Sequence, residues 1–392
     1  MRAAASARPI LFFIVTVAAA FFVAGAMGVH ALAGAPESHG KLTVKLSEKF
    51  TLHFPEGVTG VEWSPDGATL GVSSDYGVRL STYDSSGRLL STFKSTGNYL
   101  GAYINSFSFI NGASQVLFPL EDGKNYKAAL DIRDVGTGRI LQTITRDHTI
   151  IHPYYSAVSP DQKRFAIANG SGKNVVTYGS QNGADWHELS VVNVPITNAG
   201  QGKQYWYGVV SLCFFPDSKL LAIGQNEGHF AIVDSTTGQT LKDFHAYDAP
   251  VEGISLNVDA LAVSPKGDLL LTGVNGVGTS GPAISSELTS PWLKAHDGMV
   301  TVWRARDGKE VASLANPEGI IRQSVWDPRG RFVAYTNTYG FVVWQPDPPE
   351  TSFIRVTLSE LSVSLAITRD GKALAVAGGH KVTVYNIQDI QE

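Results

Sequence analysis

Short apolar runs, separated by turn residues at a regular interval, are the main feature of this sequence. Val61 and Trp63 alternate with polar neighbours up to the phrase Ser64-Pro65-Asp66-Gly67, and a second apolar run follows at residues 69–72. Proline sets φ to about −65° and glycine accepts a positive φ, so the phrase predicts a tight turn between antiparallel strands. No long segment has the period of an amphipathic helix, so the pattern predicts an all-β protein.

The turn phrase returns along the whole chain. Six intervals separate Asp66 from Asp370, with a mean spacing of about 51 residues. Each turn follows an apolar residue and precedes further short strands, although the second copy is out of phase with the others. Four short antiparallel strands in each repeat are typical of propeller blades. The seven turns, which predict seven blades, begin at residues 64, 110, 159, 215, 264, 327 and 368.

The last repeat has room for three strands only, whereas residues 41–55 are strand-like and have no repeat of their own. We therefore expect this N-terminal segment to supply the outer strand of the last blade, which would remove an exposed sheet edge. The predicted fold is a seven-bladed β-propeller of four-stranded antiparallel blades, with its ring closed by the N-terminal strand.

Three segments resemble the third strand and the following turn of a WD repeat. They are NEGHFAIVDSTTG at residues 226–238, DYGVRL at 75–80 and MVTVWR at 299–304. On these residues the chain resembles a divergent bacterial WD-repeat-like propeller over roughly residues 42–389. The Gly-His pair that opens family repeats is missing, and the Trp-Asp pair is reduced to pairs such as Trp303-Arg304. These departures argue against the family's buried Asp-His-Ser-Trp network.

The N-terminus has the pattern of an export segment. Arg2 and Arg8 precede an uncharged run at residues 9–35, and Ala31-Leu32-Ala33 offers small residues for cleavage, which predicts a secretory signal over residues 1–33. The apolar core approaches the roughly 20 residues that span a bilayer, so an uncleaved membrane anchor stays open as an alternative. Residues 34–40 are then a linker and residues 41–392 a periplasmic or extracellular propeller.

Charge and cysteine content narrow the partners. The formal net charge is −4 and no segment is strongly basic, which disfavours a nucleic-acid partner. The single cysteine, Cys213, excludes an intramolecular disulfide framework. It lies in an apolar run with no basic neighbour, so we expect a buried and unreactive thiol.

Loops that enter the innermost strands are where propellers usually meet partners. Here they carry aromatic residues and an arginine, which interface hot spots favour, although the same aromatics could fill gaps between blades. Asn257, Asp259, Tyr155 and Gln323 lie in the same loops. Two longer segments, residues 179–208 with Trp186 and residues 274–298, are expected insertions. The predicted partner-binding residues are Tyr103, Asn105, His152, Tyr154, Trp206, Tyr207 and Arg322.

No catalytic, cofactor-binding or metal-ligating residue is predicted. The sequence contains no nucleophile elbow or phosphate loop, and Pro153 argues against a helical metal pair at His148 and His152. We therefore favour an exported, non-enzymatic scaffold that binds another protein. The alternative is an extracytoplasmic propeller enzyme or small-ligand binder, of lactonase-like or quinone-cofactor type, with its site in the central channel. Convergent carboxylates with shifted pKa values at the channel mouth would favour this alternative.

Overall fold

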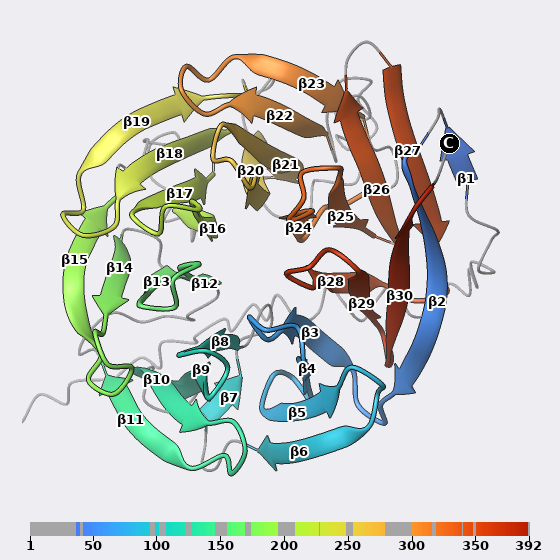
Figure 1. Ribbon diagram of the computed structural model, residues 1–392. Coiled ribbons are helices and arrows are strands. Elements are labelled where there is room, and N and C mark those ends of the chain that lie inside the picture. Colours follow the sequence, from blue (N-terminus) through green and yellow to red (C-terminus); the bar gives the residue numbers. More distant parts are fainter. Residues whose placement is uncertain are drawn as a thin grey trace, which may run out of the picture.

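The computed structural model describes residues 37–39, 42–94, 99–101, 107–122, 127–145, 155–168, 174–194, 208–226, 228–247, 254–278, 299–315, 319–338, 340–347 and 350–390. Its 30 strands form seven antiparallel sheets, arranged as blades around a central channel (Figure 1). These residues contain no helix, and therefore none that could cross a membrane. The predicted seven-bladed, all-β propeller is confirmed.

Each blade runs from an inner strand at the channel to an outer strand at the rim. The strands of the first four blades, from the inner to the outer, are β3 (Val58–Trp63), β4 (Thr69–Ser74), β5 (Arg79–Asp84) and β6 (Leu89–Lys94); β8 (Ser108–Ile110), β9 (Gln115–Asp122), β10 (Lys127–Asp134) and β11 (Ile140–Thr145); β12 (Tyr155–Val158), β13 (Arg164–Ala168), β14 (Asn174–Gly179) and β15 (His187–Asn193); β16 (Val209–Phe214), β17 (Leu220–Gln225), β18 (His229–Asp234) and β19 (Thr240–His245).

The last three blades follow the same order. Their strands are β20 (Ile254–Val263), β21 (Leu269–Gly278), β22 (Val300–Arg304) and β23 (Glu310–Leu314); β24 (Ser324–Trp326), β25 (Val333–Asn337), β26 (Gly340–Asp347) and β27 (Glu350–Thr357); β28 (Ser362–Ile367), β29 (Ala373–Gly378), β30 (Lys381–Asp389) and β2 (Val44–His53).

The repeated turn is held by its own side chains. The backbone N–H of Thr69 donates to Ser64 Oγ at 2.9 Å, and that of Ala68 donates to Asp66 Oδ1 at 3.0 Å. Gly67 has a φ of 71°, the positive value that the sequence predicted. Hydrogen bonds from Ser64 and Ala68 hold the pKa of Asp66 below its usual range, so this carboxylate stabilises the turn.

Closure of the ring follows the prediction. β2 pairs with β30 from Val44 opposite Asp389 to His53 opposite Lys381, which makes it the outer strand of blade seven. A further strand, β1 (Glu37–His39), pairs with β27 and gives blade six a fifth strand. It lies within the segment that was expected to be a linker. Residues 1–36, with the predicted signal or anchor, lie outside the described residues.

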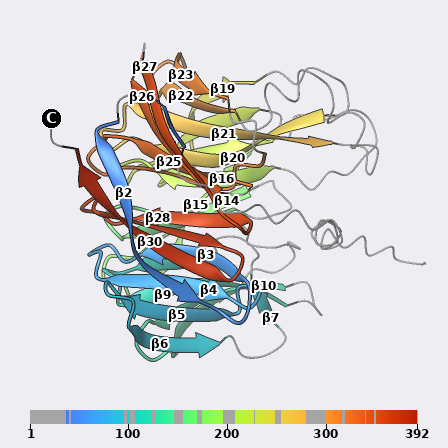
Figure 2. The same cartoon turned by 90° about the vertical axis from the view of Figure 1, so that its right-hand side faces the viewer.

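Three local expectations change. Part of the predicted insertion at residues 179–208 is strand β15, the outer strand of blade three, and Trp186 before it is buried against Phe165 with 4.9 Å between ring centroids. The first residues of the second insertion extend β21, whose hairpin with β20 projects beyond the other blades (Figure 2). Blade two, the repeat that was out of phase, contains an additional strand, β7 (Tyr99–Gly101), paired with β9.

The core lies between the blades. Seven clusters of buried apolar residues each combine side chains of two adjacent blades. Adjacent blades are also joined at the rim of the ring. A side chain on the outer strand of one blade donates a hydrogen bond to a backbone carbonyl of the next blade. That carbonyl lies in or beside the turn between the third strand and the outer strand. We call these contacts inter-blade clasps: Lys49 to Ser85, Ser91 to Val135, Gln142 to Trp186, Ser190 to Ser235 and Lys242 to Ala305, with donor–acceptor distances of 2.7–3.0 Å.

Candidate functional site

The structure describes one of the seven residues predicted to bind a partner. Arg322 lies two positions before β24, half-buried at the start of the inner strand of blade six. The other six, Tyr103, Asn105, His152, Tyr154, Trp206 and Tyr207, lie outside the described residues. The candidate site is therefore built around Arg322.

A β-bulge in blade five brings a carboxylate to the same level of the channel. The ladder between β20 and β21 shifts register between Val258 and Ala260, and Asp259 is the extra residue. Asn275, which is 2% exposed, donates from Nδ2 to Asp259 Oδ2 and to the carbonyl of Ile321, both at 2.6 Å. Its Oδ1 accepts the N–H of Ile321 at 2.8 Å. Asn275 therefore fixes Asp259 and the segment that carries Arg322.

Arg322, Asp259 and Tyr155 interact electrostatically. Tyr155 begins β12 in blade three, which lies across the channel from β24 in blade six (Figure 1). Burial lowers the pKa of Arg322, and the charge of Asp259, together with that of Tyr155 once its hydroxyl is ionised, opposes that shift. Burial raises the pKa of Asp259 to about 7, against the hydrogen bond from Asn275 and the charge of Arg322. We call Tyr155, Asp259, Asn275 and Arg322 the channel cluster.

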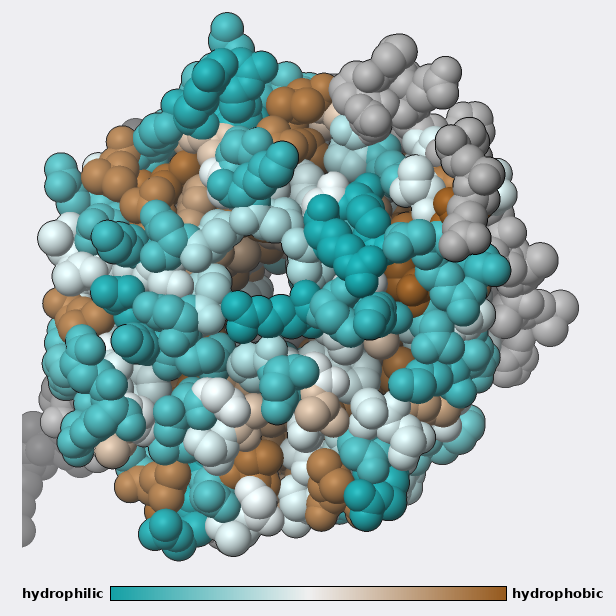
Figure 3. All heavy atoms as spheres, in the orientation of Figure 1, coloured by the Kyte–Doolittle hydropathy of each residue, from teal (hydrophilic) through white to brown (hydrophobic). Residues whose placement is uncertain are grey.

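A second carboxyl group faces a small cavity in the channel, whose central opening is visible in Figure 3. The cavity has a volume of about 230 Å³ and is lined by inner strands of five blades, with Glu62, Ser156 and Gln323 among its residues. Glu62 Oε1 accepts the N–H of Phe109 at 3.3 Å. Burial raises the pKa of Glu62 to about 8, which favours its protonated form near neutral pH.

The carboxyl groups and the thiol near the channel show no arrangement for catalysis among the described residues. Glu62 and Asp259 each accept a hydrogen bond from the protein, and those bonds fix the inner strands. Within the part of the chain that the structure describes, no three His, Cys, Asp or Glu side chains form a group that could hold a metal ion. Cys213 on β16 is half-buried, and burial raises its pKa to about 11, as expected for an unreactive thiol. The cluster suits recognition by an arginine and a tyrosine.

The sequence missed one buried network. In blade five, Trp303 Nε1 donates to Thr272 Oγ1 at 2.7 Å, and the hydroxyl of Tyr247 lies 2.7 Å from the same oxygen. All three residues are buried, and burial raises the pKa of Tyr247 to about 12. The threonine oxygen therefore joins the tryptophan and the tyrosine in one buried network. The signal was Trp303-Arg304, one of two repeats, with Trp344 in blade six, that keep a tryptophan at this place in the third strand.

Comparisons with known proteins agree on the fold. The anaphase-promoting complex subunit 4 WD40 domain family matches residues 196–259. The pre-rRNA-processing protein crb3/ipi3 of Schizosaccharomyces pombe is 25% identical over 232 residues, 53% of this chain and 48% of the relative, so the match spans about half of that protein's length. A chain in the crystal structure of a mitotic checkpoint complex is 16% identical, with a TM-score of 0.65 over 91% of this chain and 97% of that chain.

Proposed function

We propose that this chain, a WD40-like β-propeller, is a scaffold that binds another protein at the channel cluster. WD40-like propellers are typically interaction scaffolds, and the similar solved chain was crystallised within a mitotic checkpoint complex. The observation that carries the proposal is that Arg322 and Tyr155, from blades on opposite sides of the channel, lie close enough to interact electrostatically, with Asp259 in the same group. Arginine and tyrosine are enriched among residues that dominate binding energies at interfaces.

We further propose that the scaffold works outside the cytoplasm and that the kinship is bacterial. The charged and apolar pattern of residues 1–33 supports export, and the resemblance of residues 226–238 is the ground for the bacterial kinship, whereas the curated relative is a yeast protein. Comparing the size of a C-terminally tagged protein in membrane and soluble fractions tests export. A full-length product in the membrane fraction would favour the anchor over the cleaved signal.

Affinity capture from the cell-envelope fraction tests the binding site. Arg322→Ala should reduce recovery of a specific partner about tenfold, and Trp206→Ala should also reduce it. Arg369→Ala, an exposed arginine in the turn that precedes β29, is the matched control and should leave recovery unchanged. If Arg322→Ala and Trp206→Ala both bind like the unmodified protein, the partner uses a different surface.

The raised pKa values of Glu62 and Asp259 support a second candidate, a small-ligand or enzymatic site in the channel. A thermal-shift screen with lactones and quinone cofactors tests it. A ligand that raises the melting temperature of the unmodified protein, but not of Asp259→Asn or Glu62→Gln, would replace the scaffold proposal. If no lactone or quinone changes the melting temperature of the unmodified protein, this candidate is excluded for these ligand classes.

A further inference from the structure

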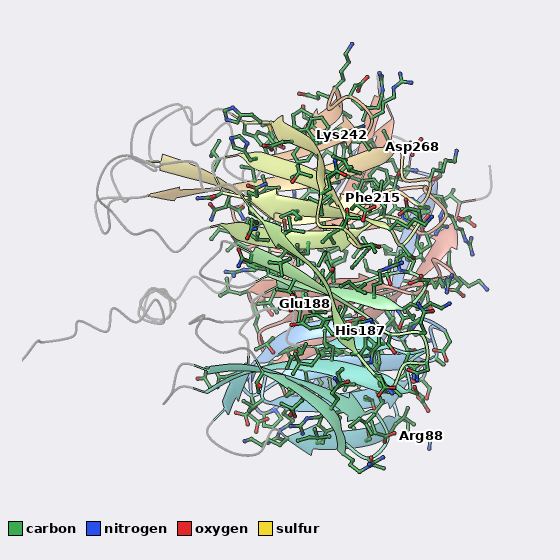
Figure 4. All side chains as sticks on the ribbon, turned by 90° about the vertical axis from the view of Figure 1, so that its left-hand side faces the viewer. Arg88, His187, Glu188, Phe215, Lys242 and Asp268 are labelled. Atoms are coloured by element: carbon green, nitrogen blue, oxygen red, sulfur yellow. The ribbon has the colours of Figure 1, made fainter. Side chains whose placement is uncertain are left out.

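A groove between blades four and five is larger than the channel cavity. Its volume is about 630 Å³, and it opens on the face that carries the repeated turns. The lining comes from the inner turns of both blades, the outer strand β19 and the turn between β22 and β23. Phe215, Lys242 and Asp268 mark it in Figure 4. We propose that this groove binds a short, extended, acidic segment of a partner protein through a central apolar side chain.

The floor of the groove is apolar. Phe215 and Ile232 belong to the core cluster between the two blades, and Leu220, Leu269 and Leu241 extend the apolar lining towards the surface. Leu241 is 47% exposed, although it lies in a strand whose Phe244 packs inward. In Figure 3 an apolar area lies at the upper left of this face, next to hydrophilic turns. A bulky apolar side chain from a partner would cover surface that is now hydrated.

The rim of the groove is basic, although the chain as a whole carries a net charge of −4. Four cationic side chains line it, Lys242, Lys266, Arg304 and Arg306, against the two carboxylates of Asp217 and Asp268.

Several of these charges already have partners within the protein. Lys242 Nζ donates to the carbonyls of Ala305 and Arg306, which are neutral groups and leave its charge uncompensated. Arg304 and Arg306 share the adjacent Asp307, at 3.2 and 3.6 Å. Asp217 Oδ1 accepts the N–H groups of Lys219 and Leu220.

The positions of Lys266 and Arg306 indicate which kind of peptide segment fits the groove. Lys266 belongs to the turn between β20 and β21, and Arg306, which has a 76% exposed side chain, to the turn between β22 and β23. An apolar side chain seated between these turns would have a cation on each side. Carboxylates on both flanks of one apolar anchor therefore match the groove in charge, and a basic segment would be repelled. Because the channel cluster uses inner-strand ends, this site does not depend on the function proposed there.

Fluorescence anisotropy with three labelled hexapeptides tests the inference. The probe has a Leu-Phe pair flanked by two glutamates on each side; a second peptide has lysines in place of the glutamates, and a third has Ser-Gly in place of Leu-Phe. The protein is the full folded domain, with melting temperatures recorded for every variant. The test variant combines Leu241→Ser, Lys266→Glu and Arg306→Glu. The matched control combines Leu141→Ser, at the equivalent place in blade two, with Arg369→Glu.

We expect saturable binding of the acidic probe, at least tenfold weaker in the test variant and unchanged in the control variant. Binding should also weaken as salt rises from 0.05 to 0.5 M, because the rim charges are exposed, on the order of tenfold. Equal affinity for the lysine or Ser-Gly peptide, or equal affinity of both variants for the probe, would overturn the proposal. Sedimentation velocity that shows a dimer lost only in the test variant would instead assign the groove to a second copy of the chain.

Discussion

The network in blade five allows a sharp test of how a divergent blade is stabilised. Thr272 is fully buried, and its hydroxyl serves both Trp303 and Tyr247. Thr272→Val keeps the shape of the side chain and removes that oxygen. Valine fits this place, because Val72 and Val376 stand at the same register in blades one and seven. The substitution therefore isolates the hydrogen bonds from the packing.

The expected cost follows from the two partners. Trp303 Nε1 loses its acceptor at 2.7 Å and keeps only its weaker contact with Tyr247, and leaving a buried donor poorly paired costs about 1–3 kcal/mol. Tyr247 also has Thr301 as a hydrogen-bond partner, so its loss should add about 1 kcal/mol. We expect Thr272→Val to lower the free energy of unfolding by about 2–4 kcal/mol. Tyr247→Phe leaves the Trp303 bond intact and should cost only about 1 kcal/mol.

Urea unfolding followed by tryptophan fluorescence measures both variants and their combination. The double variant should cost less than the sum of the single ones, because both remove the same Tyr247–Thr272 contact. If Thr272→Val unfolds within about 0.5 kcal/mol of the unmodified protein, a threshold set by typical surface substitutions, the network has no energetic role. Strict additivity in the double variant would show that the two side chains do not interact.

Three further predictions concern closure, pH and the thiol. Deleting residues 41–55 removes β2 and the nine residue pairs it makes with β30, so the whole domain should lose several kcal/mol of stability in calorimetry; an unchanged melting temperature would rule out closure by this strand. Glu62 has a folded pKa of about 8, above its ordinary value near 4.5, so the folded state binds an extra proton between these pH values. The free energy of unfolding should therefore fall as pH rises through that window, by at most about 1.4 kcal/mol per pH unit. Glu62→Gln should flatten this dependence, and identical pH profiles of the two proteins would refute the assignment. Cys213, with its pKa raised to about 11, is mostly protonated at pH 8 and should react with Ellman's reagent much faster after unfolding in guanidinium; equally rapid labelling of the native protein would contradict the raised pKa.

The repeat made the ring predictable, because the turn chemistry is local. Ser64 and Asp66 close their own turn within a few residues, so the same phrase in other copies predicts the same hairpin. The closing strand could be predicted by counting, since the last repeat lacked one strand and residues 41–55 had no repeat. β15 and β1 escaped prediction for different reasons. The residues before β15 read as loop, and the burial of Trp186 depends on Phe165 of the same blade. β1 has only three residues, too few for a period.

The candidate site was only partly predictable. Arg322 was identified as a loop residue of a type that interfaces favour, but its contacts depend on the ring. Tyr155 and Arg322 are far apart in sequence, and they interact electrostatically because blades three and six face each other across the channel. Asn275 can donate a hydrogen bond to Asp259 because a β-bulge shifts Asp259 by one register position. No local sequence pattern revealed this bulge. The groove between blades four and five likewise combines five separate segments.

Ring closure by β2 has a consequence for the order of folding. Thr51 Oγ1 lies 3.1 Å from Thr383 Oγ1, across a separation of 332 residues. During synthesis β2 leaves the ribosome before any blade is complete, yet its partner β30 follows the strands of the first six blades. Contacts of such long sequence separation form slowly, because the chain must first close a long loop. β2 is therefore made before the inner strands of all seven blades and is the last blade strand to pair, and until then it presents an open edge to chaperones or to other chains.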